Sequence, residues 1–155
     1  MNIHRRLQEL QITIPDVNPP LAAYVPGLRA GEFIYVSGQL PMQNGKLLYA
    51  GKIGRDLNLD AGKAASRLAA INCLAVLKKY LESWDELEQI VKITGYISCE
   101  SNFSEQAAVL NGASELLEQV FAEKGRHARA AVGVNSLPLN AACEVEMIAR
   151  LKTVQ

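Results

Sequence analysis

The spacing of apolar residues along the chain predicts an alternation of strands and helices. Apolar residues recur every three or four positions over residues 60–82 and 104–123, which is the period of a helix with one buried face. A shorter helix is expected over 3–11, because prolines follow it. Runs rich in β-branched and aromatic residues predict strands over 21–28, 32–37, 89–99, 128–136 and 142–152.

The order strand pair, helix, strand, helix, strand pair predicts an α/β (α+β) fold, in which a mixed sheet carries two helices on one face. The first pair should be a hairpin that turns at Ala30-Gly31, and residues 137–140 should join the last pair. Residues 42–58 are expected to be a loop with at most one short strand. The second sheet face needs a cover, and self-association is the expected one.

Composition narrows the class of protein. The 155 residues predict a single domain, 1–155, and the sixteen basic residues are balanced by sixteen acidic ones, so no basic surface for nucleic acid is expected. The longest apolar stretch, 68–77, is far shorter than the ~20 residues that span a membrane. Two histidines and three widely spaced cysteines predict no metal site, but buried, reduced thiols in a cytoplasmic protein.

Arg129 is the first candidate for chemistry. It shares a predicted strand face with Ala131 and Gly133, which are too small to fill the space beside it. A guanidinium with room beside it can bind a carboxylate or phosphate through two parallel hydrogen bonds. An arginine that pairs with a structural carboxylate, or one that lies at a rim, would fit the same pattern, and the strand spacing leaves these interpretations open.

Glu144 is the second candidate, because it shares the polar face of the last strand with Glu146. If the last two strands form a hairpin and their polar faces coincide, Gly133 lies opposite Glu144, and Arg129 lies ~13 Å further along. One chain could not then hold one small ligand between Arg129 and Glu144. Either this register is wrong or the two residues meet across a subunit boundary. A solvated strand carboxylate is the simpler alternative for Glu144.

Four segments carry a resemblance to a known family. The sequences PLAAYVP at 20–26 and YVSGQLP at 35–41 resemble the first two strands of the RidA (YjgF) family, which is also called the endoribonuclease L-PSP family. The sequences ARAAVGVNSLP at 128–138 and CEVEMIA at 143–149 resemble its closing strand pair. Asn111 matches an asparagine in a helix of the family. The resemblance covers about residues 20–151, which leaves 1–19 as an N-terminal extension.

The resemblance implies a chorismate-mutase-like fold that assembles as a homotrimer with clefts between subunits. Family members with the arginine hydrolyse reactive enamine or imine acids, such as 2-aminoacrylate, to 2-keto acids and ammonia without a metal or organic cofactor. The resemblance implies that Arg129 holds the substrate carboxylate and that Glu144 positions the attacking water. The residues implied to line the substrate cleft are Tyr24, Ser37, Gly38, Asn111 and Ala131.

Three departures from the family pattern identify a divergent branch. The deaminases of the family commonly carry a cysteine where this chain has Ala131, the region 42–60 is longer than usual, and the N-terminal extension is added. Two other functions therefore stay open: a trimer that binds small carboxylates or keto acids without turnover, and an endoribonuclease, against which the neutral charge counts. The sequence names neither the substrate nor the pathway.

Overall fold

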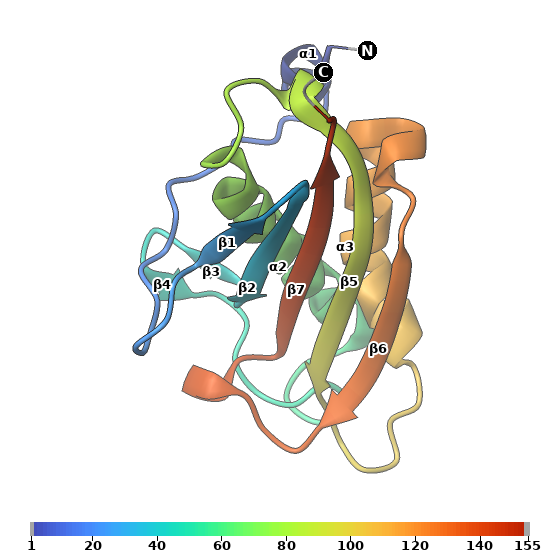
Figure 1. The fold of residues 1–155 in the computed structure, drawn as a ribbon. Helices are drawn as coiled ribbons and strands as arrows, with labels where there is room; N and C mark the ends of the chain where they lie inside the picture. Colours follow the sequence, from blue (N-terminus) through green and yellow to red (C-terminus); the bar gives the residue numbers. More distant parts are fainter. Residues whose placement is uncertain (1, 154–155) are drawn as a thin grey trace.

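A five-stranded sheet with two long helices on one face forms the body of the protein (Figure 1). The structure is a computed structural model that describes residues 2–153, so both ends of the expected domain lie outside the described residues. The helices are α1 (Ile3–Glu9), α2 (Leu59–Lys78) and α3 (Gln106–Phe121), with short 3-10 turns η1 (Trp84–Glu86), η2 (Ala122–Gly125) and η3 (Pro138–Asn140). The strands are β1 (Gly27–Ala30), β2 (Phe33–Gln39), β3 (Met42–Gln43), β4 (Lys46–Leu47), β5 (Leu87–Ser98), β6 (Ala128–Val134) and β7 (Cys143–Leu151).

The strand order of the large sheet is β1-β2-β7-β5-β6, with β6 parallel to β5 and every other pair antiparallel. This confirms the mixed sheet with two helices on one face. The expected hairpin of the last two strands is wrong, because β5 lies between them (Figure 1). The connection through η3 takes the chain past the end of β5, and Leu139 and Asn140 adopt left-handed conformations there, with φ of 57° and 60°.

The N-terminal half differs from the prediction in two places. The first strand begins at Gly27 rather than at residue 21, because Pro26 has no N–H to offer a ladder and the preceding segment is irregular. The hairpin at Ala30-Gly31 is confirmed, and Gly31 takes the turn with φ +61°. The loop over 42–58 contains two short strands, β3 and β4, rather than one at most.

The long helices also lie close to their predicted positions. Asn58 caps α2 by accepting a hydrogen bond from the Ala61 N–H. The expected cap of α3 by Ser101 or Ser104 is wrong, because Glu105 stands at that position and makes no side-chain cap. The Gln106 side chain instead donates back to the Phe103 carbonyl at 2.8 Å, which closes the turn ahead of the helix.

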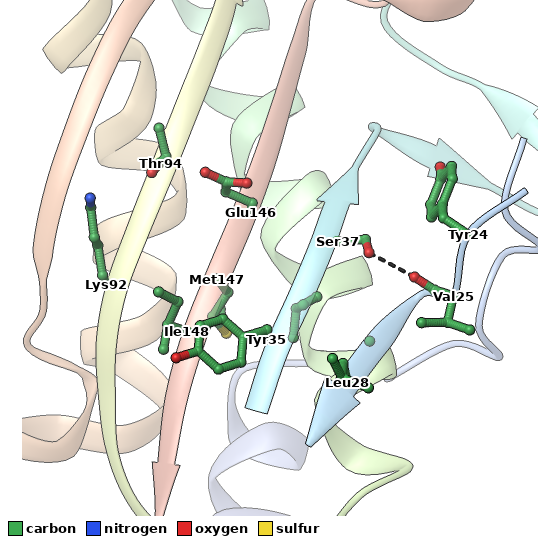
Figure 2. A pocket seen from close by; sticks show the side chains of 12 residues that line it. Tyr24, Val25, Leu28, Tyr35, Ser37, Lys92, Thr94, Glu146, Met147 and Ile148 are labelled. Atoms are coloured by element: carbon green, nitrogen blue, oxygen red, sulfur yellow. Dashed lines mark hydrogen bonds between the residues drawn. The ribbon is translucent and has the colours of Figure 1, made fainter. Parts of the chain in front are cut away.

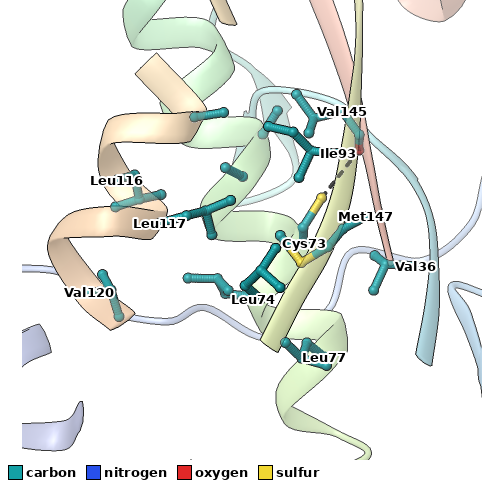
Figure 3. Packing of buried hydrophobic residues seen from close by; sticks show 14 of the residues in the cluster. Val36, Cys73, Leu74, Leu77, Ile93, Leu116, Leu117, Val120, Val145 and Met147 are labelled. Atoms are coloured by element: carbon teal, nitrogen blue, oxygen red, sulfur yellow. Dashed lines mark hydrogen bonds between the residues drawn. The ribbon is translucent and has the colours of Figure 1, made fainter. Parts of the chain in front are cut away.

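The hydrophobic core lies between the sheet and the two long helices (Figure 3). Alternate residues of β7, from Cys143 to Leu151, are buried on this inner face, as the strand pattern predicts. The three cysteines, Cys73, Cys99 and Cys143, are buried and free, as expected. The outer face carries exposed apolar side chains instead, including Tyr35 and Val132, with exposed fractions of 45% and 42%.

The two long helices approach each other closely at Gly112 of α3. A Cβ atom on Gly112 would lie 2.0 Å from the Lys63 carbonyl oxygen and 2.5 Å from Ser66 Oγ. Ser66 is fully buried and donates from Oγ to the Val109 carbonyl at 2.6 Å, which ties α2 to α3 at this crossing. The sequence therefore needs glycine at position 112 for space, not for an unusual backbone conformation.

We expect Gly112→Ala to lower the free energy of unfolding by about 3 kcal/mol, because the added methyl group must push backbone atoms apart in a packed interior. Urea titration followed by circular dichroism measures the change. Gly31→Ala is the control: nothing lies within 4 Å of its Cβ, and only the positive φ should cost about 1 kcal/mol. A smaller effect at position 112 than at 31 would contradict the close crossing.

Candidate functional site

The predicted site residues form two groups on opposite faces of the sheet. Tyr24, Ser37, Gly38 and Glu144 lie on or beside the outer, helix-free face. Arg129, Ala131 and Asn111 lie at the other edge of the sheet, where β6 meets α3.

The outer face holds a concave pocket of about 390 Å³, which Figure 2 shows from close by. Tyr24 and Ser37 both line it, together with Glu146. Ser37 donates from Oγ to the Val25 carbonyl at 2.7 Å, and this bond holds the irregular segment that carries Tyr24 beside β2. Tyr24 was expected in a strand, but the bond to Ser37 rather than a strand ladder sets the position of its segment.

Glu144 lies against the backbone of Gly38. A Cβ atom at position 38 would lie 2.0 Å from Glu144 Oε1, so glycine provides the space for this carboxylate. Partial burial raises the pKa of Glu144, and the nearby charge of Glu146 raises it further. Glu144 can therefore take or release a proton closer to neutral pH than an ordinary glutamate.

Tyr96 is a functional candidate that the sequence reasoning missed. It is the direct cross-strand partner of Glu144, and its hydroxyl donates to Glu146 Oε1 at 2.9 Å. This hydrogen bond is the main reason that the pKa of Tyr96 is raised, followed by burial. The alternation of β5 could have placed Tyr96 on a polar face, but only the register against β7 shows which carboxylate it meets.

Arg129 lies at the edge of the sheet and points toward α3. Its Nη1 donates to Ser114 Oγ at 3.0 Å and its Nη2 to the Ala107 carbonyl at 3.2 Å. Asn111 lies between these two anchors on the same stripe of the helix, because residues three and four apart share a face. Two of the five guanidinium N–H donors are thus used by neutral acceptors.

The partners of Arg129 test whether this residue forms a structural ion pair. Among residues 2–153, no carboxylate oxygen lies within 4.0 Å of its guanidinium, whereas Arg126 nearby pairs with Glu123 at 3.3 Å. The expected alternative of a structural ion pair is therefore absent in the described part of the chain. The guanidinium is exposed and keeps three N–H donors, which is enough for a two-bond grip on an anion.

The space beside Arg129 is smaller than its small strand neighbours suggest. Ala131 is half-buried and packs against the core. A Cβ atom on Gly133 would lie 3.0 Å from both Cys99 Sγ and Gln106 Nε2, so these side chains fill the space above that glycine. The small residues on this strand face are therefore in contact with neighbouring side chains of the same chain.

The sequence reasoning assumed that the polar faces of β6 and β7 coincide. In the structure they do not. Glu144 lies on the outer face, because Cys143 and Val145 on either side of it are buried inward. Arg129 pairs with Ile93, which is buried, and bonds to α3 on the inner side. One sheet thickness and two strand spacings of ~4.8 Å each separate the two residues within one chain.

In the described part of the chain, no group of three histidine, cysteine or acidic side chains is placed to hold a metal ion. No helix among residues 2–153 has the length and apolar character needed to cross a membrane.

Comparison with known proteins places this fold in a family. The family model described as "YjgF/chorismate mutase-like, putative endoribonuclease" matches residues 4–151. The chain belongs to the YjgF family. This confirms the resemblance to RidA (YjgF) proteins and the chorismate-mutase-like fold. The match also begins within the N-terminal segment 1–19, at the residue that follows Ile3 of α1.

Individual relatives cover nearly the whole YjgF domain. The protein TCP17 of Trypanosoma cruzi is 38% identical over 146 residues, which are 94% of this chain and 91% of that protein. The crystal structure of Atu1372 from Agrobacterium tumefaciens, a protein of unknown function, has 42% identity and a TM-score of 0.91, covering 97% of this chain and 92% of that one. The structure of Escherichia coli TdcF with bound serine has 23% identity and a TM-score of 0.63, covering 86% and 92%, and so shares the fold.

The raised pKa of Glu144 predicts how the stability of this YjgF protein depends on pH. Because the folded state binds the proton more tightly than the unfolded state, the free energy of unfolding falls as pH rises from the ordinary glutamate pKa through the raised one. Glu144→Gln carries no charge to desolvate. We expect this variant to be more stable than the parent at neutral pH, with the difference vanishing below the ordinary glutamate pKa.

Urea unfolding at fixed protein concentration across this pH range measures the difference. Glu115→Gln, which changes an exposed carboxylate of α3, is the matched control and should leave stability nearly unchanged. A Glu144→Gln variant that is less stable than the parent at neutral pH would show that the ionised carboxylate makes a favourable contact that outweighs its desolvation.

Proposed function

We propose that this YjgF protein hydrolyses small enamine or imine acids, such as 2-aminoacrylate, to 2-keto acids and ammonia, without a cofactor and in clefts between subunits. The observation that carries the proposal is the state of Arg129. Its guanidinium is exposed at a sheet edge, is held by neutral acceptors, and has no carboxylate partner among residues 2–153. Such a group binds a ligand carboxylate without first breaking an ion pair.

The comparisons support a small ligand of this class. TdcF was solved with bound serine, an amino acid whose carboxylate is of the kind that a guanidinium binds. The two chains share the fold at 23% identity, so serine is a guide to ligand size and charge for this chain, not an assigned substrate.

The separation of the two residue groups supports a site between subunits. Arg129 lies on β6, the edge strand of the sheet, where a second copy can approach it. The outer face that carries Glu144 also exposes Tyr35 and Val132, which a neighbouring chain would cover. A closed ring of copies that joins the edge of one chain to the outer face of the next would bring Arg129 and Glu144 together, and we propose a homotrimer as that ring.

The chemistry requires few groups. Protonation of the enamine at carbon gives the imine, water adds to the carbon of the C=N bond, and the resulting carbinolamine collapses to a C=O group as the C–N bond breaks and ammonia leaves. Arg129 would hold the carboxylate and so orient the C=N bond. Glu144, with its raised pKa, would take a proton from the attacking water and return one to the departing nitrogen.

Binding without turnover is the second candidate function. The observation that favours it is Ala131, which stands where deaminases of the family commonly have cysteine, so no thiol is available at that position. Mass spectrometric detection of 2-keto acid from enzymatically generated 2-aminoacrylate separates the two. The parent should accelerate hydrolysis and Glu144→Gln should lose most of that rate while keeping keto-acid affinity. Equal rates with and without the protein would favour the binding function.

The family description also includes an endoribonuclease. Sixteen basic and sixteen acidic residues leave no net charge to attract a phosphate backbone. RNA binding measured at increasing salt tests this reading directly. A steep loss of affinity with salt, together with cleavage, would replace the deaminase proposal.

We predict that Arg129→Ala weakens the binding of pyruvate or 2-ketobutyrate by about 2–5 kcal/mol, because the ligand carboxylate loses a partner in a desolvated cleft. Arg129→Lys should be intermediate, since lysine keeps the charge but not the planar two-bond grip. Isothermal titration measures both. Thermal melts should show folded variants, because Arg129 has no ion-pair partner to lose among the described residues.

The matched control is Arg126→Ala, which removes a nearby arginine whose side chain pairs with exposed Glu123. Its keto-acid affinity should equal that of the parent. If Arg129→Ala unfolds the protein, the residue is structural; if it binds as well as the parent, the site lies elsewhere.

We predict that the protein is a trimer in solution. Sedimentation at micromolar concentration should give three times the chain mass of 16.9 kDa. Val132→Glu, on the exposed outer face of the edge strand, should weaken the assembly by placing a charge in an apolar contact. A stable monomer that still binds keto acids would rule out the intersubunit site.

A further inference from the structure

Three side chains form a continuous hydrogen-bonded line behind the proposed carboxylate site. Arg129 Nη1 donates to Ser114 Oγ at 3.0 Å. Ser114 Oγ lies 2.9 Å from His127 Nε2, and His127 Nδ1 lies 2.5 Å from the Gly125 carbonyl oxygen. The line runs from the exposed edge of β6 to the backbone at the end of η2.

The direction of each hydrogen bond in this line follows from the chemistry of the groups. A carbonyl oxygen only accepts, so His127 Nδ1 must carry a hydrogen and donate it to Gly125. In the neutral imidazole the other nitrogen, Nε2, then accepts, and the Ser114 hydroxyl donates to it. The lone pairs of Ser114 Oγ are thereby left facing the guanidinium of Arg129.

We propose that Ser114 and His127 are positioning residues that hold the Arg129 guanidinium ready for a carboxylate and so set the affinity and charge preference of the site. The carboxylate ligand rests on the function proposed above. The assignment of these two residues goes beyond it, since neither was a candidate from the sequence motifs.

The physical reason for a positioning role is the exposure of Arg129. An exposed arginine samples many rotamers, and fixing them on binding costs affinity. Two anchors on α3 reduce that cost before the ligand arrives. One anchor, the Ala107 carbonyl, is backbone and cannot be removed by substitution, whereas Ser114 can be. His127 acts only through Ser114, because it fixes which way the hydroxyl points.

The test compares the affinity for a charged ligand with the affinity for a neutral ligand of similar shape. Isothermal titration is carried out with pyruvate and with its neutral amide, pyruvamide, on the parent protein, four test variants and two control variants. Ser114→Ala removes the anchor and Ser114→Thr keeps a hydroxyl. His127→Phe removes the acceptor for that hydroxyl and His127→Gln restores one. The substitutions Ser104→Ala and His4→Phe, which change exposed residues, are the matched controls.

We expect Ser114→Ala to weaken pyruvate binding about tenfold, because a hydrogen bond to a charged group is lost. Pyruvamide affinity should stay the same, and Ser114→Thr should restore pyruvate binding to within about twofold. His127→Phe should weaken pyruvate binding by less than Ser114→Ala, and His127→Gln should recover part of the loss. The two controls should match the parent with both ligands.

Each other outcome has a distinct meaning. If the parent binds pyruvate and Ser114→Ala binds it equally well, the positioning role is overturned while the proposed function stands. If Ser114→Ala loses both ligands and melts at lower temperature, the residue is structural and the inference is again wrong. If the parent binds no 2-keto acid at all, the proposed function fails and this inference fails with it.

Discussion

The burial of one face of the sheet under α2 and α3 determines where every polar side chain of the strands can point. Along β7, inward residues from Cys143 to Leu151 are buried against the helices, so Glu144 and Glu146 must project outward. At the edge strand β6 the cover by α3 is incomplete, and Arg129 can point inward, bond to the helix and still reach solvent. Arg129 and Glu144, the two charged residues of the proposed site, therefore lie on opposite faces of one sheet.

The sequence predicted the elements of this fold better than their arrangement. Helical periodicity and strand alternation are local patterns, and they located both long helices and the inward face of β7. The order of strands depends on contacts between distant segments. Nothing local to residues 137–140 shows that β5 lies between the strands that they join. In the same way, the local pattern before Pro26 does not show that this segment is too irregular for a strand.

The same distinction applies to the site. Arg129 and its small strand neighbours could be recognised from spacing and from the family resemblance, and the absence of a carboxylate partner in the described chain removes the ion-pair alternative. Ser114 and His127 could not be recognised, because they lie thirteen residues apart on a helix and a connecting segment without a shared motif. Tyr96 was hidden in a similar way, since its contact with Glu146 depends on the pairing of β5 with β7.

Dividing the site between faces has a consequence for its charges. Among residues 2–153, no basic side chain lies within 4.0 Å of the Glu144 carboxylate and no acidic one lies within 4.0 Å of Arg129, so neither group has an ion-pair partner. If assembly brings these groups together, an ionised Glu144 competes with the ligand carboxylate for Arg129. A protonated Glu144 does not compete, and the upward shift of its pKa, caused by partial burial and by the charge of Glu146, lowers its ionised fraction at a given pH. The partial burial that makes Glu144 costly to ionise would thus weaken its competition for Arg129, while the ionised form can still take a proton from water.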